Sequence, residues 1–324
     1  MNSQGTNLLT AKPVYKPFAY PWAYEAWKEQ QKLHWLPDEV PLGEDVKDWK
    51  INLSDGERNL LSQIFRFFTQ ADIEVNECYL TKYSQVFKPT EIRMMMSAIA
   101  NIETVHIDAY SHLMDTLGFD EEEYSAFREY KEMEDKYNYY SKFDVEDKIG
   151  VAETMAVYGA FTEGLQLFAS FAILLNFPRF GKMKGMGQII QWSVRDESLH
   201  CECIVRLYHE WLKENPDIDT DSLTVRITEH LHNIIMMEDR FIDLAFELGP
   251  VEGLTADEVK LYIRYLADRR MEQLRLAKQF FIDKNPIPWI DAYMSGPRHT
   301  NFFEQKSTEY SKASTTGSWE DVSF

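Results

Sequence analysis

Two Glu-x-x-His pairs, Glu103/His106 and Glu197/His200, are the residues of this chain whose types and spacing most directly indicate chemistry. In an α-helix, residues three positions apart lie on one face, so each pair can direct a carboxylate and an imidazole at a single centre. Helical bundles that bind two carboxylate-bridged metal ions combine two such pairs with one acid from each of two further helices. The chemistry indicated is therefore the binding of two metal ions.

The spacing alone is a weak signal, because the chain contains a third match, Glu229/His232. The neighbours on each helical face separate the three pairs. Apolar and aromatic residues surround the first two pairs at intervals of three and four, which is typical of buried faces. Glu229/His232 shares its face with serine, asparagine and arginine residues, which indicates a solvated surface. We therefore interpret only the first two pairs as ligands.

Asp72 and Glu163 are the further acids, and each lies among apolar residues at helical spacing. A buried carboxylate without a partner is strongly unfavourable or takes up a proton, and a divalent cation removes this cost. Four carboxylates and two imidazoles form a hard ligand set that suits iron or manganese. Their negative charge favours oxygen activation over hydrolysis, which would need an open, cation-lined cleft. The predicted metal ligands are Asp72, Glu103, His106, Glu163, Glu197 and His200.

Tyr110 follows His106 by four residues and Glu103 by seven, so it lies on the same helical face one turn beyond the predicted metal site. A phenol in this position can be oxidised. A core tyrosine whose hydroxyl is satisfied by a hydrogen bond is the ordinary alternative, and the residues alone leave both interpretations open.

The chain is predicted to be all-α, because its apolar residues recur with helical periodicity between capping residues and do not show the alternating pattern of strands. Ser54 to Glu57 and Thr255 to Glu258 are predicted capping boxes. The predicted helices cover residues 22–34, 54–86, 90–117, 120–138, 145–176, 182–214, 219–248 and 255–283. Each half of the ligand set places one acid before one Glu-x-x-His, which predicts two packed helical hairpins.

Composition limits the partners and the location. The 324 residues carry a net charge of -19, which argues against nucleic acid or an anionic membrane as a partner. The apolar run at residues 168–177 is too short to span a membrane, and the N-terminus lacks a signal-peptide pattern. A cytoplasmic location is expected.

Cys78, Cys201 and Cys203 form no disulfide framework or zinc spacing and are interpreted as buried thiols, although a thiolate ligand at Cys201 or Cys203 is conceivable.

The two ends differ from the helical middle. Residues 1–21 read as an extended N-terminal arm, and residues 22–284 as the dimetal helical domain. Residues 285–324 are rich in small polar residues, which predicts a flexible tail. The tail also carries aromatic residues, which favours a peptide that docks on a partner over an ordinary frayed end.

Together these residues resemble the small, radical-generating subunit of class I ribonucleotide reductase. The resemblance extends from Trp35 in KLHWLPDEV to the tail, and its motifs are Asp72, ETVH with Tyr110 four residues later, EGLQLFASF from Glu163, and RDESLH from Arg195. It implies a ferritin-like helical bundle with additional helices, assembled as a homodimer. It also implies that a dimetal centre generates a tyrosyl radical, which is passed to a large catalytic subunit that reduces ribonucleotides to deoxyribonucleotides.

Carried onto this sequence, the resemblance makes Tyr110 the radical site and Asp196 the residue that connects His106 to Trp35. Tyr310 corresponds to the tail tyrosine that relays the radical to the large subunit, on which the tail would dock. Two positions depart from the usual pattern: Ser193 replaces a common isoleucine and Leu167 a common large aromatic residue. Both would border the radical tyrosine.

Two other functions compete with this interpretation. One is a related ferritin-like dimetal oxidase that acts on a bound lipid or hydrocarbon, and the other is an iron-storage protein. The oxidase would need an open apolar channel but has no use for Trp35, Asp196 or the aromatic tail. A storage protein would load many ions per chain, whereas a cofactor stops at about two. The sequence leaves open whether the centre contains two iron or two manganese ions, whether a separate flavoprotein activase delivers the oxidant, and whether diphosphates or triphosphates are reduced.

Overall fold

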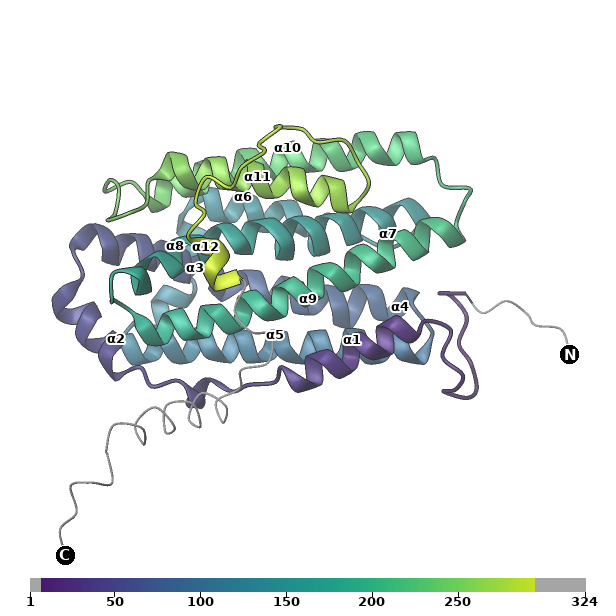
Figure 1. The fold of residues 1–324 in the computed structure, drawn as a ribbon, viewed down its shortest axis with the longest axis horizontal. Coiled ribbons are helices and arrows are strands. Elements are labelled where there is room, and N and C mark those ends of the chain that lie inside the picture. The colour runs from purple at the N-terminus through teal and green to yellow at the C-terminus, as the bar shows by residue number, and fades with distance from the viewer. Residues whose placement is uncertain (1–6, 295–324) are drawn as a thin grey trace, which may run out of the picture.

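The computed structural model describes residues 7–294, and within them long helices run side by side in an elongated bundle (Figure 1). The all-α prediction is confirmed for this part of the chain, where β structure is confined to one isolated bridge between Val251 and Leu254. The α-helices are α1 (Pro21–Lys32), α2 (Gly43–Lys47), α3 (Asp55–Glu77), α4 (Ser84–Val86), α5 (Thr90–Leu117), α6 (Lys131–Tyr140), α7 (Lys148–Thr154), α8 (Leu167–Arg179), α9 (Lys184–Glu214), α10 (Thr220–Ala245), α11 (Ala256–Gln273) and α12 (Ile290–Met294).

Two helical hairpins form the centre of the bundle. Helix α3 packs on α5, and the continuous helix that includes α7 and α8 packs on α9. Helix α1 covers α5 and also contacts α9, while α10 and α11 pack over the outer side of the second hairpin (Figure 1). Each hairpin contributes one predicted acid and one Glu-x-x-His, as the order of the ligands along the chain predicted.

Two long helices widen into π-helical turns where the sequence predicted uninterrupted helix. Residues Cys78–Tyr83 continue α3 in this form, and residues Met155–Gln166 connect α7 to α8. Within the second segment, the Thr162 hydroxyl donates to the carbonyl oxygen of Val157 at 3.1 Å. Such widened turns are uncommon and often occur at functional sites. The segment Met155–Gln166 carries the predicted ligand Glu163.

Both predicted capping boxes are present. The Ser54 hydroxyl accepts from the Glu57 backbone N–H at 3.2 Å, and the Glu57 carboxylate accepts from the Ser54 N–H at 2.8 Å. Thr255 and Glu258 make the same reciprocal pair at the start of α11, at 3.3 Å and 2.9 Å. Each pair satisfies two backbone donors that a helix start leaves without partners.

The predicted helix over residues 255–283 is too long, because α11 ends at Gln273. The buried carboxylate of Asp268 accepts from the backbone N–H groups of Gln279 and Phe280, at 2.8 Å and 2.9 Å, and also from Ile282. These bonds draw the chain back along α11. The predicted helix at residues 120–138 is also wrong in part, since residues 121–129 form two 3₁₀ turns before α6 begins.

The structure describes the predicted tail as far as Met294. In this part, Ile287 and Ile290 are buried, and α12 packs against α8 and α9. The first residues of the predicted tail are therefore part of the packed bundle. At the other end, residues 7–20 contain no helix, and Leu8 is buried. The boundaries proposed for the arm and for the docking tail stay predictions.

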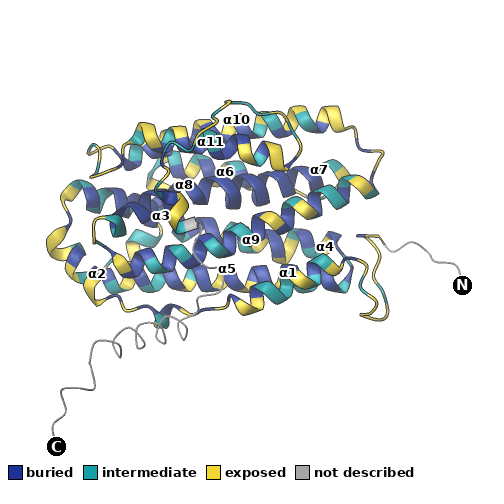
Figure 2. Ribbon diagram, in the orientation of Figure 1, coloured by how far each residue is buried: buried dark blue, intermediate teal, exposed yellow. Residues whose placement is uncertain are grey.

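The segment Lys148–Arg179 is long and apolar enough to cross a membrane, and it is longer than the apolar run seen in the sequence. Its most apolar window is entirely buried inside the bundle, as the dark blue colouring of α8 in Figure 2 illustrates. The apolar composition is explained by this burial on all sides. The segment is the central core helix.

Gly159, in the π-helical segment, provides a test of this close packing. A Cβ atom at Gly159 would lie 2.4 Å from Cγ2 and 2.6 Å from Cβ of Ile204 on α9. Overpacking of this kind costs about 1–3 kcal/mol, so Gly159→Ala should lower the free energy of unfolding by this amount in denaturant titrations. Gly43→Ala is the matched control, because a Cβ there meets no atom within 4 Å. Equal stability of the two variants would contradict the packing argument.

Candidate metal centre

The predicted ligands from four different helical segments meet in the middle of the bundle. Glu103 of α5, Glu163 of the π-helical segment, and Glu197 and His200 of α9 each present a ligand atom, and these four atoms all lie within 4.8 Å of one another. All four residues are fully buried. Residues that share a helical face in the sequence therefore also meet residues of the other helices in the folded chain.

His106 and Asp72 lie beside this cluster. His106 Nδ1 is 3.5 Å from Glu103 Oε2 and 3.2 Å from Glu197 Oε1. Asp72 is 2% exposed, and its carboxyl group is influenced by the charges of Glu103, His106 and Glu197. The structure thus brings five of the six predicted ligands into close contact, and the buried Asp72 lies near enough for its charge to interact with theirs.

Several ligand atoms at this site lack hydrogen bonds to the described residues. They are Asp72 Oδ2, both carboxylate oxygens of Glu103 and of Glu197, and His200 Nδ1. His200 Nδ1 does lie 3.0 Å from Glu103 Oε1, but the contact lacks the direction of a hydrogen bond. Buried polar atoms without partners are costly and rare in native proteins. Their inward convergence, together with the donor set, fits a pair of hard metal ions.

The charges of the cluster shift its pKa values in opposite directions. Burial raises the pKa of Asp72 well above its ordinary value, and the charge of Glu103 adds to this. Burial, with the charge of Glu197, does the same for Glu163. Burial alone would also raise the pKa of Glu103, but His106 and His200 lower it to about 2. Interaction with Glu103 and Glu197 outweighs burial and raises the pKa of His200 to about 10.

Asp196 connects the cluster to Trp35, as the family resemblance implied. The Trp35 indole N–H donates to Asp196 Oδ2 at 2.8 Å, and the same oxygen lies 3.3 Å from His106 Nε2. Asp196 is completely buried, and Trp35 is 3% exposed. A carboxylate that accepts from the outer nitrogen of a metal-binding histidine fixes the ring orientation and directs the inner nitrogen at the metal.

Two residues at the site were missed in the sequence. The Gln30 amide of α1 donates to Asp196 Oδ1 at 3.2 Å, and its oxygen lies 3.2 Å from His200 Nε2. Tyr79 donates its hydroxyl to Glu163, at 2.8 Å and 3.0 Å from the two carboxylate oxygens. Tyr79 follows Asp72 by seven residues on the same apolar face, which was a usable signal. No local pattern distinguished Gln30.

Tyr110 is 4% exposed and packs its ring against Phe68, with centroids 4.6 Å apart, and toward His106, with centroids 6.4 Å apart. Its hydroxyl donates to the Ser193 hydroxyl at 2.9 Å. Leu167, the other unusual position, is buried at the start of α8. Burial and the loss of solvation raise the pKa of the Tyr110 phenol above its ordinary value.

The remaining predictions concern the third Glu-x-x-His pair, the cysteines and Tyr310. Glu229 and His232 are exposed, which confirms that this third Glu-x-x-His is a surface feature. Cys78, Cys201 and Cys203 are buried free thiols. Burial raises the pKa of Cys201 to about 11, so a thiolate is disfavoured there. Tyr310 lies outside the described residues.

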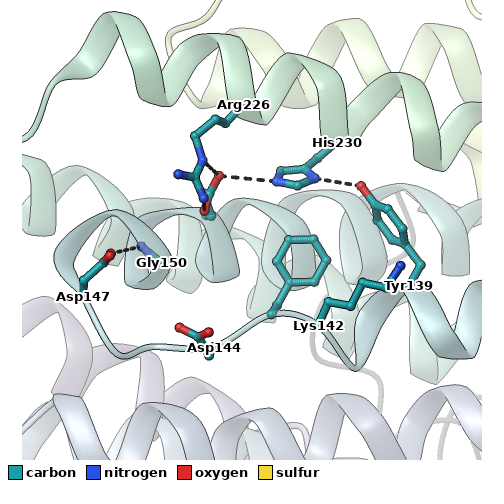
Figure 3. A pocket seen from close by; sticks show the side chains of 9 residues that line it. Tyr139, Lys142, Asp144, Asp147, Gly150, Arg226 and His230 are labelled. Atoms are coloured by element: carbon teal, nitrogen blue, oxygen red, sulfur yellow. Dashed lines mark hydrogen bonds and ion pairs between the residues drawn. The ribbon is translucent and has the colours of Figure 1, made fainter.

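A separate surface pocket of about 250 Å³ lies between α6, α7 and α10 (Figure 3). In it, Arg226 pairs with the carboxylate of Glu153, and His230 lies 3.3 Å from Glu153 and 2.7 Å from the Tyr139 hydroxyl. These polar groups satisfy one another and link the three helices. None of the six predicted metal ligands lines the pocket.

The bundle and its buried acid–imidazole cluster define a ferritin-like protein of the dimetal carboxylate class. Comparison with known proteins identifies the branch of this class. The family model described as ribonucleotide reductase, small chain, matches residues 12–286. The chain therefore belongs to the ribonucleotide reductase small chain family, and its function is that of a small subunit of this oxidoreductase.

Individual relatives agree with this assignment. A probable ribonucleoside-diphosphate reductase small subunit of Invertebrate iridescent virus 6 is 40% identical over 98% of both chains. The subunit beta of Chlamydia pneumoniae is 29% identical, covering 92% of this chain and 89% of its own length.

Solved structures show the same fold. The R2 subunit of Clostridium botulinum matches with a TM-score of 0.83 and 22% identity, over 90% of this chain and 96% of its own. The dimanganese(II)-NrdF of Streptococcus sanguinis matches with a TM-score of 0.76 and 19% identity, over 88% and 99%.

Binding of metal to the metal-free protein is expected to release protons. His200, with a pKa of about 10, holds a proton near pH 7 when no metal is bound, and burial raises the pKa values of Asp72 and Glu163, which favours their protonated forms. Metal ligands must be deprotonated, so anaerobic addition of Fe(II) or Mn(II) should release protons and raise the unfolding temperature. Because deprotonation is easier at higher pH, this stabilisation should increase from pH 6 to pH 8.

The proton release can be measured in weakly buffered solution with an indicator dye, and the stability by calorimetry. His200→Ala should reduce both effects, whereas His232→Ala, which alters the exposed third pair, should leave them unchanged. Equal loss in the two variants would argue against the cluster as the binding site.

Proposed function

We propose that this chain uses its buried cluster to bind two metal ions and to oxidise Tyr110 to a tyrosyl radical for a large catalytic subunit. The observation that carries the proposal is the position of Tyr110, one turn beyond His106 on α5 and buried beside the acid–imidazole cluster. The proposed ligands are Asp72, Glu103, His106, Glu163, Glu197 and His200. When bound, the two metal ions would supply an oxygen-dependent oxidant able to remove an electron and a proton from a phenol.

Two iron or two manganese ions are proposed as the cofactor. Both are served by an oxygen-rich set with two imidazoles, and supply rather than affinity order decides between such metals. The structurally similar NrdF of Streptococcus sanguinis is a dimanganese(II) protein. Activation by a separate flavoprotein is a compatible route for the oxidant.

Trp35 and Asp196 are proposed to carry the oxidising equivalent from the cluster toward the large subunit. The indole N–H donates to the carboxylate that also lies beside His106, so a continuous polar connection runs from α5 through α9 to the segment after α1. Moving an electron and a proton together along such bonds avoids a buried, uncompensated charge. Gln30 and Arg195 hold Asp196 from its other oxygen, at 3.2 Å and 3.7 Å.

The proposed assembly is a homodimer that docks on the large subunit through its C-terminal tail, with Tyr310 as the relay at the interface. The support is the aromatic composition of the tail and the family to which the chain belongs. A cytoplasmic location is proposed with it. The oxidase and storage alternatives are not favoured by the family membership.

Replacing Tyr110 with phenylalanine should abolish the organic radical while the cluster still binds metal, because only the phenol oxygen is removed. Electron paramagnetic resonance after anaerobic loading with Fe(II) or Mn(II) and exposure to the oxidant measures the first effect, and metal analysis the second. Tyr208→Phe, a buried tyrosine elsewhere on α9, is the control. An unchanged radical spectrum in the Tyr110 variant would refute the assignment of this residue.

Deleting residues 300–324 should abolish nucleotide reduction through loss of binding to the large subunit. The radical yield and metal content of the truncated protein should equal those of the full chain, because the ligands and Tyr110 lie within α3 to α9. Sedimentation or surface binding with the large subunit measures the association. Full reductase activity after truncation would count against a docking tail.

A further inference from the structure

The Tyr110 hydroxyl forms its hydrogen bond with a serine at a position where the family pattern suggested an isoleucine. Tyr110 donates to Ser193 Oγ at 2.9 Å, and Ser193 in turn donates to the backbone carbonyl oxygen of Ile189 at 3.2 Å. Ser193 is completely buried within α9. The two bonds form a short chain that runs from α5 into the backbone of α9.

The direction of this chain follows from the donors and acceptors available. A carbonyl oxygen can only accept, so the single proton of the Ser193 hydroxyl points at Ile189. The serine oxygen is then free to accept from Tyr110. Asp72 Oδ2, by contrast, has no hydrogen-bond partner among the described residues. The phenol is therefore held toward the serine on α9 and not toward the carboxylate on α3.

Oxidation changes the hydrogen-bonding role of the Tyr110 phenol oxygen from donor to acceptor. A neutral tyrosyl radical has lost one electron and the hydroxyl proton, both removed by the oxygen-dependent oxidant of the proposed function, so its oxygen can only accept hydrogen bonds. The Ser193 hydroxyl rotates about a single bond and carries the one proton in this pair. Its release from Ile189 costs little, because a helical carbonyl also accepts from the backbone N–H four residues later.

We propose that Ser193 is a positioning residue whose hydroxyl accepts from Tyr110 in the resting state and rotates to donate to the Tyr110 oxygen in the radical state. This inference rests on the proposed function, since it assumes that the radical forms at Tyr110. The ring of Phe68 packs against the phenol, and Ser193 is the polar group that contacts its oxygen. One serine thus holds the tyrosine oxygen in the same place in both oxidation states.

The test is electron–nuclear double resonance of the radical in H₂O and in D₂O. The unaltered protein should show a strongly coupled exchangeable proton near the phenoxyl oxygen, and a g-tensor shifted by hydrogen bonding. Ser193→Ala should lose this coupling and shift the g-tensor, with metal content unchanged. Ser193→Thr, which keeps the hydroxyl, should retain the coupling.

Ser198→Ala is the matched control. Ser198 lies on the same helix, is half-buried, and makes the same type of bond to a carbonyl four residues earlier, from its Oγ to the Val194 oxygen at 2.7 Å. Its replacement should leave the radical spectrum unchanged.

The outcomes separate the two proposals. Absence of any radical in the unaltered protein, or a radical that survives in Tyr110→Phe, would overturn the proposed function. A radical at Tyr110 without an exchangeable proton coupling, or with the same coupling in Ser193→Ala, would overturn the role of Ser193 alone. The exchangeable proton coupling is measured in the unaltered protein. The role of Ser193 can therefore be refuted even if the Ser193→Ala variant fails to fold.

Discussion

The constraint on which the structure depends is the burial of four carboxylates in the apolar centre of a helical bundle. A carboxylate removed from water must be paired, protonated or bound to a cation, because its uncompensated charge is far more costly than the stability of a typical domain can absorb. In this chain the two cluster imidazoles compensate part of the charge, and they lower the pKa of Glu103 to about 2. Burial and neighbouring acids instead raise the pKa values of Asp72 and Glu163. The buried charge is thus compensated partly by imidazoles and partly by a preference for protonated carboxyl groups.

The surrounding helices are arranged to hold these groups in place. The π-helical segment Met155–Gln166 packs against α9 along its length, and Tyr79 fixes the orientation of Glu163 from the neighbouring helix. Asp196 and Gln30 contact the outer nitrogens of the two histidines, which leaves the inner nitrogens facing the acids. Three of the six proposed ligands, Glu163, His106 and His200, therefore have a polar partner on the side away from the cluster, which helps a site to keep its geometry while its charge changes.

Much of this could be predicted from the sequence, because helical periodicity and burial are local properties. The six proposed ligands, the position of Tyr110 beside them and both capping boxes followed from spacing and from the character of their neighbours, whereas the radical role of Tyr110 was implied by the family resemblance. The widened turns could not be predicted, since Met155–Gln166 has the composition of an ordinary apolar helix. The end of α11 was also missed, because Asp268 captures backbone groups more than ten residues later and no local pattern announces such a bond. Gln30 was missed for the same reason, as its partners are on α9. Polar contacts that a single residue makes with distant parts of the chain could not be predicted from the sequence.

The contact of α1 with the cluster has a consequence for how the protein is made. Gln30 and Trp35 meet Asp196 across 166 and 161 residues of chain, and Gln30 meets His200 across 170. During synthesis these early residues emerge long before α9 exists, and contacts of such large sequence separation form late because the loop between them must first close. The histidines therefore gain their outer partners only after more than half of the chain has been made. The complete set of partners around the histidines can therefore form only after α9 has been made, so this part of the site is assembled late in synthesis.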